Sequence, residues 1–413
     1  MGHRSKFATL KSILTSEYWL LFSLSGVFFC FFAHGAGANL FAELCGIFLI
    51  IELLLGSYRL KQIPSWYLVF AAICAYLVLA SLLNPYGYSY LRYIKRLGRM
   101  VIIVFAIHCL SQKDINDRMT LLFSGMLVLS VCWQFAAHSF FNMPNGTYDN
   151  RHYLAGFAIL ALPLIGYYLL VTPKWYKYIF LAIGILNAYL LWQTSSRPAF
   201  WTVACVALFV LIFQSKGWYR WIGLIVILLT ITVLYLTDYR IATTNPNNPV
   251  TLKNIFHTLA KEERILIWKD TWKMLMDNSF IGWIFGNGIG SFRERFVEYV
   301  IPKWRDNELV SPHSFFLDIL YQNGVVGFIL VFGGFGFLLS ATIIKARNTL
   351  MKQRSTLLKC MIILFLIWFI YCGLVFPIYS NYSLIPLAFI LGSMLLFLEK
   401  TPGAKVLDQN STG

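Results

Sequence analysis

The sequence is poor in charge. Of its 413 residues, 13% are Asp, Glu, Lys or Arg, whereas 58% are hydrophobic, and soluble domains carry roughly twice that charged fraction. Apolar runs of about 20 residues recur along the whole chain, and this is the length that a helix needs to cross a bilayer. The pattern indicates an integral membrane protein and argues against one large soluble helical protein.

Sequence patterns for metal or serine chemistry are also lacking. There is no HExxH, no GxSxG and no Asp-x-Asp pair in the segments expected outside the membrane. The eight cysteines lie in or beside apolar runs, and none is spaced as CxxC. Neither a zinc site nor a disulfide framework is indicated. We therefore expect no cofactor and metal-independent chemistry.

Acidic residues are few. The chain has 18 Asp and Glu against 34 Lys and Arg, a formal net charge of +16. In a soluble protein this excess would suggest nucleic acid, but Lys and Arg also gather in the cytoplasmic loops of membrane proteins. With the N-terminus inside, every expected inside connection is basic, for example at Arg59 and Lys61 or at Lys345 and Arg347. We therefore expect a membrane environment and no nucleic-acid partner.

Twelve spans are predicted. Residues 1–237 hold the first nine transmembrane helices, 238–312 form one large loop on the outer face, 313–398 hold the last three helices, and 399–413 are a cytoplasmic tail. In a Gram-negative cell the outer face is periplasmic. The expected spans are 18–34, 38–57, 66–83, 97–110, 119–138, 152–171, 177–193, 199–213, 220–237, 313–341, 359–376 and 382–398.

Several basic residues on the outer side break the charge trend. Four of the six enter the fourth span, and Arg197 lies between two apolar helices. The full set is Arg92, Lys95, Arg96, Arg99, Arg151 and Arg197. An arginine at the bilayer centre costs roughly 2.5–3.5 kcal/mol on insertion scales and usually marks function or pairing. We expect few acids outside to pair with them. Guanidinium groups grip a diphosphate bidentately, although snorkelling to lipid headgroups would also explain the cluster at 92–99.

Asp238 to His313 is the one long polar interval of the sequence. Within it, Trp268, Trp272 and Leu275 fall at i, i+4 and i+7, which predicts an amphipathic helix suited to the membrane interface. Glycines 286, 288 and 290 follow. No strand precedes them and no Lys-Ser/Thr follows, so a tight turn between two interfacial helices is favoured over a nucleotide loop.

Ser311-Pro312-His313 closes this loop. Ser is a good N-cap and Pro a good first helical residue, so we expect His313 in the first turn of the next helix. The positive helix end disfavours the imidazolium, and a neutral ring can act as a general base. An ordinary interfacial histidine is the alternative. A second histidine, His152, follows Asp149 and Arg151 and could line a polar cavity.

Together these segments resemble the O-antigen ligase and O-antigen polymerase superfamily. The resemblance rests on Thr194–Arg197, on Arg264-x-x-x-Trp268 with Gly286–Phe292, on His313–Leu317 with Gly324–Gly327, and on Asp149–Ala155. It covers the architecture of the whole chain and, in motifs, mainly residues 149–327. Two positions depart from the family pattern. Gln322 stands where many relatives have Glu, and Ser279-Phe280 stands where a Pro usually precedes the glycine turn.

The resemblance implies an all-α, C-type glycosyltransferase in the bacterial inner membrane, with about twelve transmembrane helices and an active site on the periplasmic face. Such proteins take a glycan from undecaprenyl diphosphate. Ligases give it to the lipid A core, polymerases give it to another lipid-linked repeat, and protein-specific relatives give it to a Ser hydroxyl. The length of the chain and its single long loop look most like a ligase.

The resemblance also implies roles for residues. The expected catalytic residues are Arg197, Arg264 and His313. The diphosphate is expected to bind Arg197 and Arg264 together with Arg92, Lys95, Arg96 and Arg99. The glycan and acceptor are expected to be lined by Asp149, Arg151, His152 and Trp268.

In this mechanism His313 accepts or orients the proton of the acceptor hydroxyl, and direct attack inverts the anomeric carbon. The rival from another class is a transporter of lipid-linked sugars. Transporters, however, often have inverted repeats and a site at the bilayer midplane. Here the polar residues gather at one face, beside one asymmetric loop.

Overall fold

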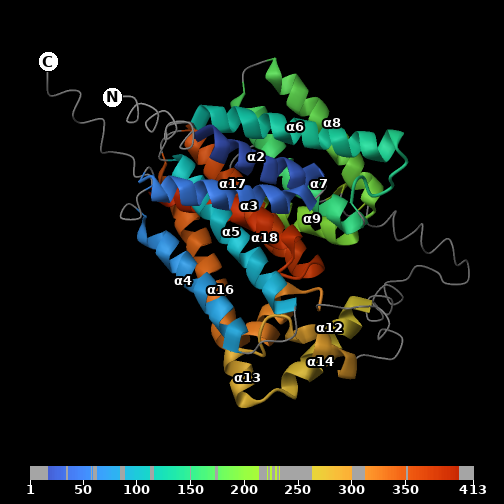
Figure 1. Ribbon diagram of the computed structural model, residues 1–413. Helices are drawn as coiled ribbons and strands as arrows, with labels where there is room; N and C mark the ends of the chain where they lie inside the picture. The colour runs from blue at the N-terminus through green and yellow to red at the C-terminus, as the bar shows by residue number, and fades with distance from the viewer. Residues whose placement is uncertain are drawn as a thin grey trace, which may run out of the picture.

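The computed structural model of the chain (Figure 1) describes residues 17–33, 36–56, 58, 63–83, 89–111, 116–148, 150–172, 175–213, 221, 224, 225, 228, 229, 232, 263–299, 312–349 and 352–399. Throughout these ranges the regular structure is helical. The helices are α2 (Glu17–Ala33), α3 (Ala36–Leu54), α4 (Ser65–Leu83), α5 (Ser89–Ser111), α6 (Asn116–Phe140), α7 (Arg151–Val171), α8 (Tyr176–Thr194), α9 (Arg197–Phe213), α12 (Glu263–Met276), α13 (Phe280–Phe285), α14 (Ser291–Tyr299), α16 (Phe315–Asn348), α17 (Lys352–Val375) and α18 (Asn381–Glu399).

Each span expected from the sequence, apart from 220–237, overlaps one of these helices. Seven helices are long and apolar enough to cross a membrane, and two more apolar stretches, Tyr18–Phe32 and Arg197–Phe209, are shorter. Most of the span expected at 220–237 and much of the long loop lie outside the described residues. The chain is a multi-pass helical membrane protein. Helices suit this setting because each one satisfies its backbone groups internally, without water.

Helix α17 lies at the centre of the bundle. Of its apolar stretch 67% is buried, compared with 22% for α16 and 28% for α4. It packs against α7, α9, α16 and α18. The fully buried indole of Trp368 donates to the Ser383 carbonyl of α18 at 2.8 Å. The apolar side chains exposed on outer helices, such as Ile329 on α16, form the surface that a bilayer would cover.

Helices α12, α13 and α14 gather beyond one end of α16 (Figure 1). They enclose a small apolar core of their own, to which α16 contributes the buried Tyr321 and the partly buried Leu317 and Leu320. Its buried members are Ile267, Met274, Leu275, Phe292, Phe296 and Tyr321. The loop helices are thus built onto the end of α16, and their position is set by packing.

The buried face of α12 differs from the expected stripe. Trp272 is 45% exposed, whereas Ile267, Thr271 and Leu275 are buried. Trp272 therefore lies outside the stripe that packs against the protein, and its ring lies edge-on to that of Trp283 in α13, with 6.4 Å between centroids. Residues 267, 271 and 275 form an equally good helical stripe one position away. Contact with α14 and α16 decided between the two.

Helix α16 is broken near its start, although the sequence predicted one continuous span from 313 to 341. Gly324 has φ 65° and ψ −173°. In the turn between α13 and α14, Gly286, Gly288 and Gly290 have φ 84°, 87° and 95°. Left-handed values of this kind favour glycine. The tight turn expected at these glycines is confirmed.

The glycine turn docks directly onto the break in α16. The backbone nitrogen atoms of Asn287 and Gly288 donate to the carbonyl oxygens of Tyr321 and Gln322 at 3.1 and 2.9 Å. A Cβ added at Gly324 would overlap the carbonyl oxygen of Ile284. The two chain segments therefore approach more closely than any side chain would allow.

Replacing Gly324 by Ala should lower the thermal unfolding midpoint. At φ 65° and ψ −173° the backbone lies in a region almost restricted to glycine, which costs a residue with a Cβ roughly 1–3 kcal/mol. The new methyl group also overlaps the Ile284 carbonyl. Gly336→Ala in the same helix is the control, because nothing lies within 4 Å of its added Cβ. That variant should be neutral or more stable by up to about 1 kcal/mol. Equal midpoints for the two variants, measured in detergent, would contradict the docking argument.

Candidate functional site

Two side chains that the sequence marked cover the C-terminal end of α17. Nη1 of Arg264 donates to the carbonyl oxygen of Leu374 at 3.0 Å, and Nδ1 of His313 lies 3.3 Å from the carbonyl oxygen of Val375. The last carbonyls of a helix have no partner within the helix and carry a partial negative charge. Two distant motifs thus meet on consecutive carbonyl groups.

His313 precedes its helix, and the expectation that it lies in the first turn was wrong. Helix α16 begins at Phe315 with Ser314 as its N-cap, and His313 has a left-handed backbone with φ 48°. Such a conformation is uncommon outside glycine and clusters at functional sites. Trp268 supports this turn, because its Nε1 donates to the Pro312 carbonyl at 3.0 Å.

The imidazole of His313 is held in its neutral form. Burial lowers its pKa from the ordinary value of 6.5, the hydrogen bond to Val375 opposes that shift, and the charge of Arg264 lowers the pKa further. A carbonyl oxygen can only accept a hydrogen bond. In the neutral ring the proton therefore lies on Nδ1, facing Val375, and the lone pair lies on Nε2.

The segment around Arg197 meets the start of α7. Helix α8 ends at Thr194, Ser195 is left-handed with φ 46°, and α9 begins at Arg197. Nδ1 of His152, the second residue of α7, lies 3.2 Å from the Ser196 hydroxyl oxygen. The two motifs that contain these residues are therefore joined by a direct contact.

Tyr371 links this contact to the end of α17. Its hydroxyl donates to the His152 carbonyl at 2.7 Å and is within hydrogen-bonding reach of Ser196. His152 in turn interacts electrostatically with Arg264, Arg151 and His313. The four motif segments thus form one site. Sequence reasoning missed Tyr371, because it lies inside an apolar span and no local pattern distinguishes it from other membrane residues.

The site has an excess of positive charge from helix ends and side chains. Helix α7 begins at Arg151 and α9 begins at Arg197. Arg151 is exposed, and Arg197 and Arg264 are half-buried. A helix N-terminus carries partial positive charge and favours an anion. Two such ends and three guanidinium groups therefore make the site suited to a multiply charged anion.

The basic cluster of α5 is held differently. Nζ of Lys95 and Nη2 of Arg99 lie 2.9 and 2.7 Å from a carboxylate oxygen of Glu43. The expectation that few acids pair with this cluster was wrong for these two residues, because Glu43 lies inside the apolar run of α3. Arg92 is exposed. Nη1 of Arg96 donates to the carbonyl oxygen of Tyr379 at 3.1 Å.

Tyr379 lies in the turn between α17 and α18, so the α5 cluster borders the same turn that follows Leu374 and Val375. The structure therefore brings Arg264, Arg151, His152 and His313 together. Ser196, the residue before Arg197, contacts His152, and Arg96 of α5 reaches the α17–α18 turn. Asp149 lies outside the described residues.

A buried relay ties the glycine turn to the same α17–α18 turn. The backbone nitrogen of Gly290 donates to the side-chain oxygen of Gln322, and the Gln322 amide donates to Asp318. The other carboxylate oxygen of Asp318 accepts from the backbone nitrogen of Ile378 at 3.2 Å. Asp318 and Gln322 are both buried. The sequence had marked Gln322 only as a departure from a family pattern.

Among the described residues, no group of three or more His, Cys, Asp or Glu side chains is placed to hold a metal ion. The positive charge at the site comes from arginines and helix ends, which can hold an anion by hydrogen bonds.

The O-antigen ligase family model matches residues 179–332 of the chain. The matched stretch runs from α8 to the part of α16 that follows the break, and it contains Arg197, Arg264 and His313. A search of curated proteins gave no significant match.

Replacing Gln322 by Glu should destabilise the protein. The carboxylate would face Asp318 in a buried position and could no longer donate to it, and an unsatisfied buried polar group costs about 1–3 kcal/mol or more. The unfolding midpoint should recover as pH falls, because protonating one carboxyl group removes the repulsion. Gln193→Glu, at an exposed position, is the control. A Gln322→Glu midpoint equal to that of wild type at pH 8 would contradict the relay.

Proposed function

This chain belongs to the O-antigen ligase superfamily, and from that premise we propose that it transfers a preassembled glycan from undecaprenyl diphosphate to the lipid A core in lipopolysaccharide biosynthesis. The observation that carries the proposal is the meeting of Arg264 and His313 on consecutive carbonyls of α17. This arrangement places the guanidinium of Arg264, a cation for the leaving group, beside the neutral imidazole of His313, a base. The site faces the periplasm from the inner membrane.

The arginines hold the diphosphate of the donor. Arg197 and Arg264 bind it, Arg151 adds charge from the start of α7, and the N-terminal ends of α7 and α9 contribute partial positive charge. The leaving group is a lipid diphosphate, and its charge is spread over several oxygen atoms. Fixed guanidinium groups can stabilise that charge as it develops. The reaction therefore needs no metal ion.

The α5 cluster has a supporting role in this proposal. Lys95 and Arg99 share Glu43, so their net contribution of charge is smaller than the sequence suggests. Arg96 and the exposed Arg92 extend the positive surface beyond the α17–α18 turn. A long diphosphate-linked lipid approaching the site passes this surface.

His313 acts on the acceptor. Its Nε2 accepts the proton of the acceptor hydroxyl while the hydroxyl oxygen forms a bond to the anomeric carbon. The bond from that carbon to the diphosphate oxygen breaks on the opposite side, so the configuration inverts. The diphosphate leaves with the electron pair, held by the arginines. His152 and Trp268 line the glycan and acceptor, and Trp268 also fixes the His313 turn.

Substitutions of Arg264 and His313 test this arrangement. In membranes of a deletion strain, His313→Ala should reduce glycan transfer by about 10²–10⁴-fold, which is the usual contribution of a general base. Arg264→Ala and Arg197→Ala should reduce it by a similar order, because each removes charge from the leaving-group site. His138→Ala, in α6 away from the site, is the control. Normal transfer by both Arg197→Ala and His313→Ala, at normal protein levels, would overturn the proposal.

The surface glycan of the deletion strain identifies the acceptor. A ligase predicts that long chains vanish from the lipid A core while undecaprenyl-linked chains persist. A core carrying a single repeat would instead identify a polymerase. Loss of glycan from a protein would identify a protein O-oligosaccharyltransferase. Persistence of all of these glycans would contradict the proposed transfer and reopen the alternative of lipid-linked sugar transport.

The pH dependence of transfer reports the protonation of His313. The neutral ring is the active form, and its folded pKa lies below 6.5. The apparent kcat/KM should therefore be flat from pH 8 to about pH 6.5 and should fall at lower pH, as the ring gains a proton. The residual activity of His313→Gln should lack this acid limb. An acid limb that begins above pH 7 in wild type would contradict a lowered pKa.

A further inference from the structure

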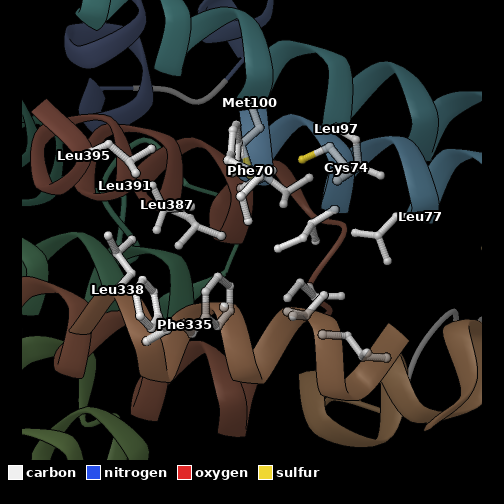
Figure 2. A pocket seen from close by; sticks show the side chains of 18 of the residues that line it. Phe70, Cys74, Leu77, Leu97, Met100, Phe335, Leu338, Leu387, Leu391 and Leu395 are labelled. Atoms are coloured by element: carbon white, nitrogen blue, oxygen red, sulfur yellow. The ribbon is translucent and has the colours of Figure 1, made fainter. Parts of the chain in front are cut away.

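An apolar cavity of about 330 Å³ lies between α4, α5, α16 and α18. Figure 2 shows side chains from these helices converging on it, among them Cys74, Leu97, Phe335 and Leu391. Its lining is aliphatic and aromatic apart from the sulfur atoms of Cys74 and Met100. The hydroxyl of Tyr379, another lining residue, donates to Asn323. Water gains few hydrogen bonds in such a space, whereas a hydrocarbon fits it.

The cavity is long. Its lining on α18 runs from Leu384 to Leu395, which corresponds to roughly 16 Å at 1.5 Å per residue. At one side it reaches the surface of the bundle, where Trp66, Val69 and Phe337 of its lining are exposed. Trp66 and Phe337 stack there, with ring centroids 5.1 Å apart. This shape suits a chain that enters sideways between α4 and α16 from the bilayer.

One end of the cavity borders positive charge. Leu97 of α5 lines the cavity, and its neighbour Arg96 donates to the carbonyl oxygen of Tyr379, which is also a lining residue. Lys95 and Arg92 are exposed on the same helix. An apolar slot with cations at one end matches a lipid whose single long chain carries an anionic head.

The same end leads to the candidate active site. Ile378 and Tyr379 line the cavity, and they lie in the turn that directly follows Leu374 and Val375, the residues bound by Arg264 and His313. A chain held in this cavity would have its head at the α17–α18 turn. This continuity favours the donor lipid over an unrelated bilayer lipid as the occupant.

We propose that the cavity between α4, α5, α16 and α18 binds the part of the polyprenyl chain nearest the diphosphate of the donor. This assignment rests on the proposed function, because it takes the donor to be a polyprenyl diphosphate. The rest of the chain, which is much longer than the cavity, remains in the bilayer. Arg96 lies at the head of the chain, and binding in the cavity guides the diphosphate toward Arg264.

Two adjacent glycines of α16 give a matched test. Gly334 lines the cavity, and a Cβ there meets only the end of the Ile73 side chain, at 3.1 Å. Gly333 is next to it in the same helix, outside the lining, and nothing lies within 4 Å of its added Cβ. The side chain introduced by Gly334→Leu fills the cavity, whereas the one introduced by Gly333→Leu does not. Both changes alter helix propensity equally.

The probe is undecaprenyl diphosphate without a glycan, bound to the purified full-length protein in nanodiscs. Each methylene group displaced from an apolar site weakens binding by about fourfold. Gly334→Leu should therefore bind the probe roughly tenfold more weakly or worse, and Gly333→Leu should bind within about twofold of wild type. Equal binding by wild type and Gly334→Leu would overturn the proposal.

Photo-crosslinking locates the chain independently of any substitution. A polyprenyl diphosphate with a diazirine near its head should label α4, α16 or α18 in wild type. Labels confined to α7, α8 or α9 would place the donor lipid elsewhere. If phosphatidylglycerol reduced the labelling as well as the unlabelled polyprenyl diphosphate does, the cavity would hold an ordinary bilayer lipid. Failure of wild type to bind the probe at all would count against the proposed function. If wild type and Gly334→Leu both bound the probe normally, the result would count against the cavity as the binding site and not against the proposed function.

Discussion

The last carbonyl groups of α17 require hydrogen-bond donors from outside the helix, and the residues of the candidate site provide them. The helix ends inside the protein, where unpaired carbonyl groups are costly because little water reaches them. Arg264 satisfies Leu374, and His313 contacts Val375. The groups proposed for catalysis therefore also close the helix that forms the core of the bundle. This requirement fixes their positions, and it orients His313 with its Nδ1 toward the protein.

Arg264 can reach that helix end only because the loop helices are rigidly placed. The glycine turn is pressed onto the break in α16, and the relay through Gln322 and Asp318 carries the connection to Ile378. Burial of the small core under α12 adds apolar stabilisation to these bonds. A site on a long loop thereby gains the stiffness of the bundle, which precise positioning of a base and a leaving group requires.

The two basic groups of the outer face have different surroundings. The α5 cluster is partly neutralised by Glu43, and Arg96 turns to a backbone carbonyl. Arg151 and Arg197 instead begin α7 and α9, whose N-terminal ends carry partial positive charge of their own. The difference supports a division of roles, in which α5 guides an anionic lipid and the site at α7, α9 and α12 holds its diphosphate.

The sequence by itself determined the helices, the membrane setting and the motifs at 149–155, 194–197, 264 and 313, because these follow from apolar run length and local residue type. It also predicted the glycine turn. Only the tertiary structure decided which face of α12 is buried, that His313 stands before its helix in a left-handed turn, and that Glu43 and Tyr371 take part. These depend on contacts between segments far apart in the chain. Hydropathy and local spacing carry no information about such contacts, so a carboxylate or a tyrosine inside an apolar run looks like any other membrane residue until its partner is placed beside it.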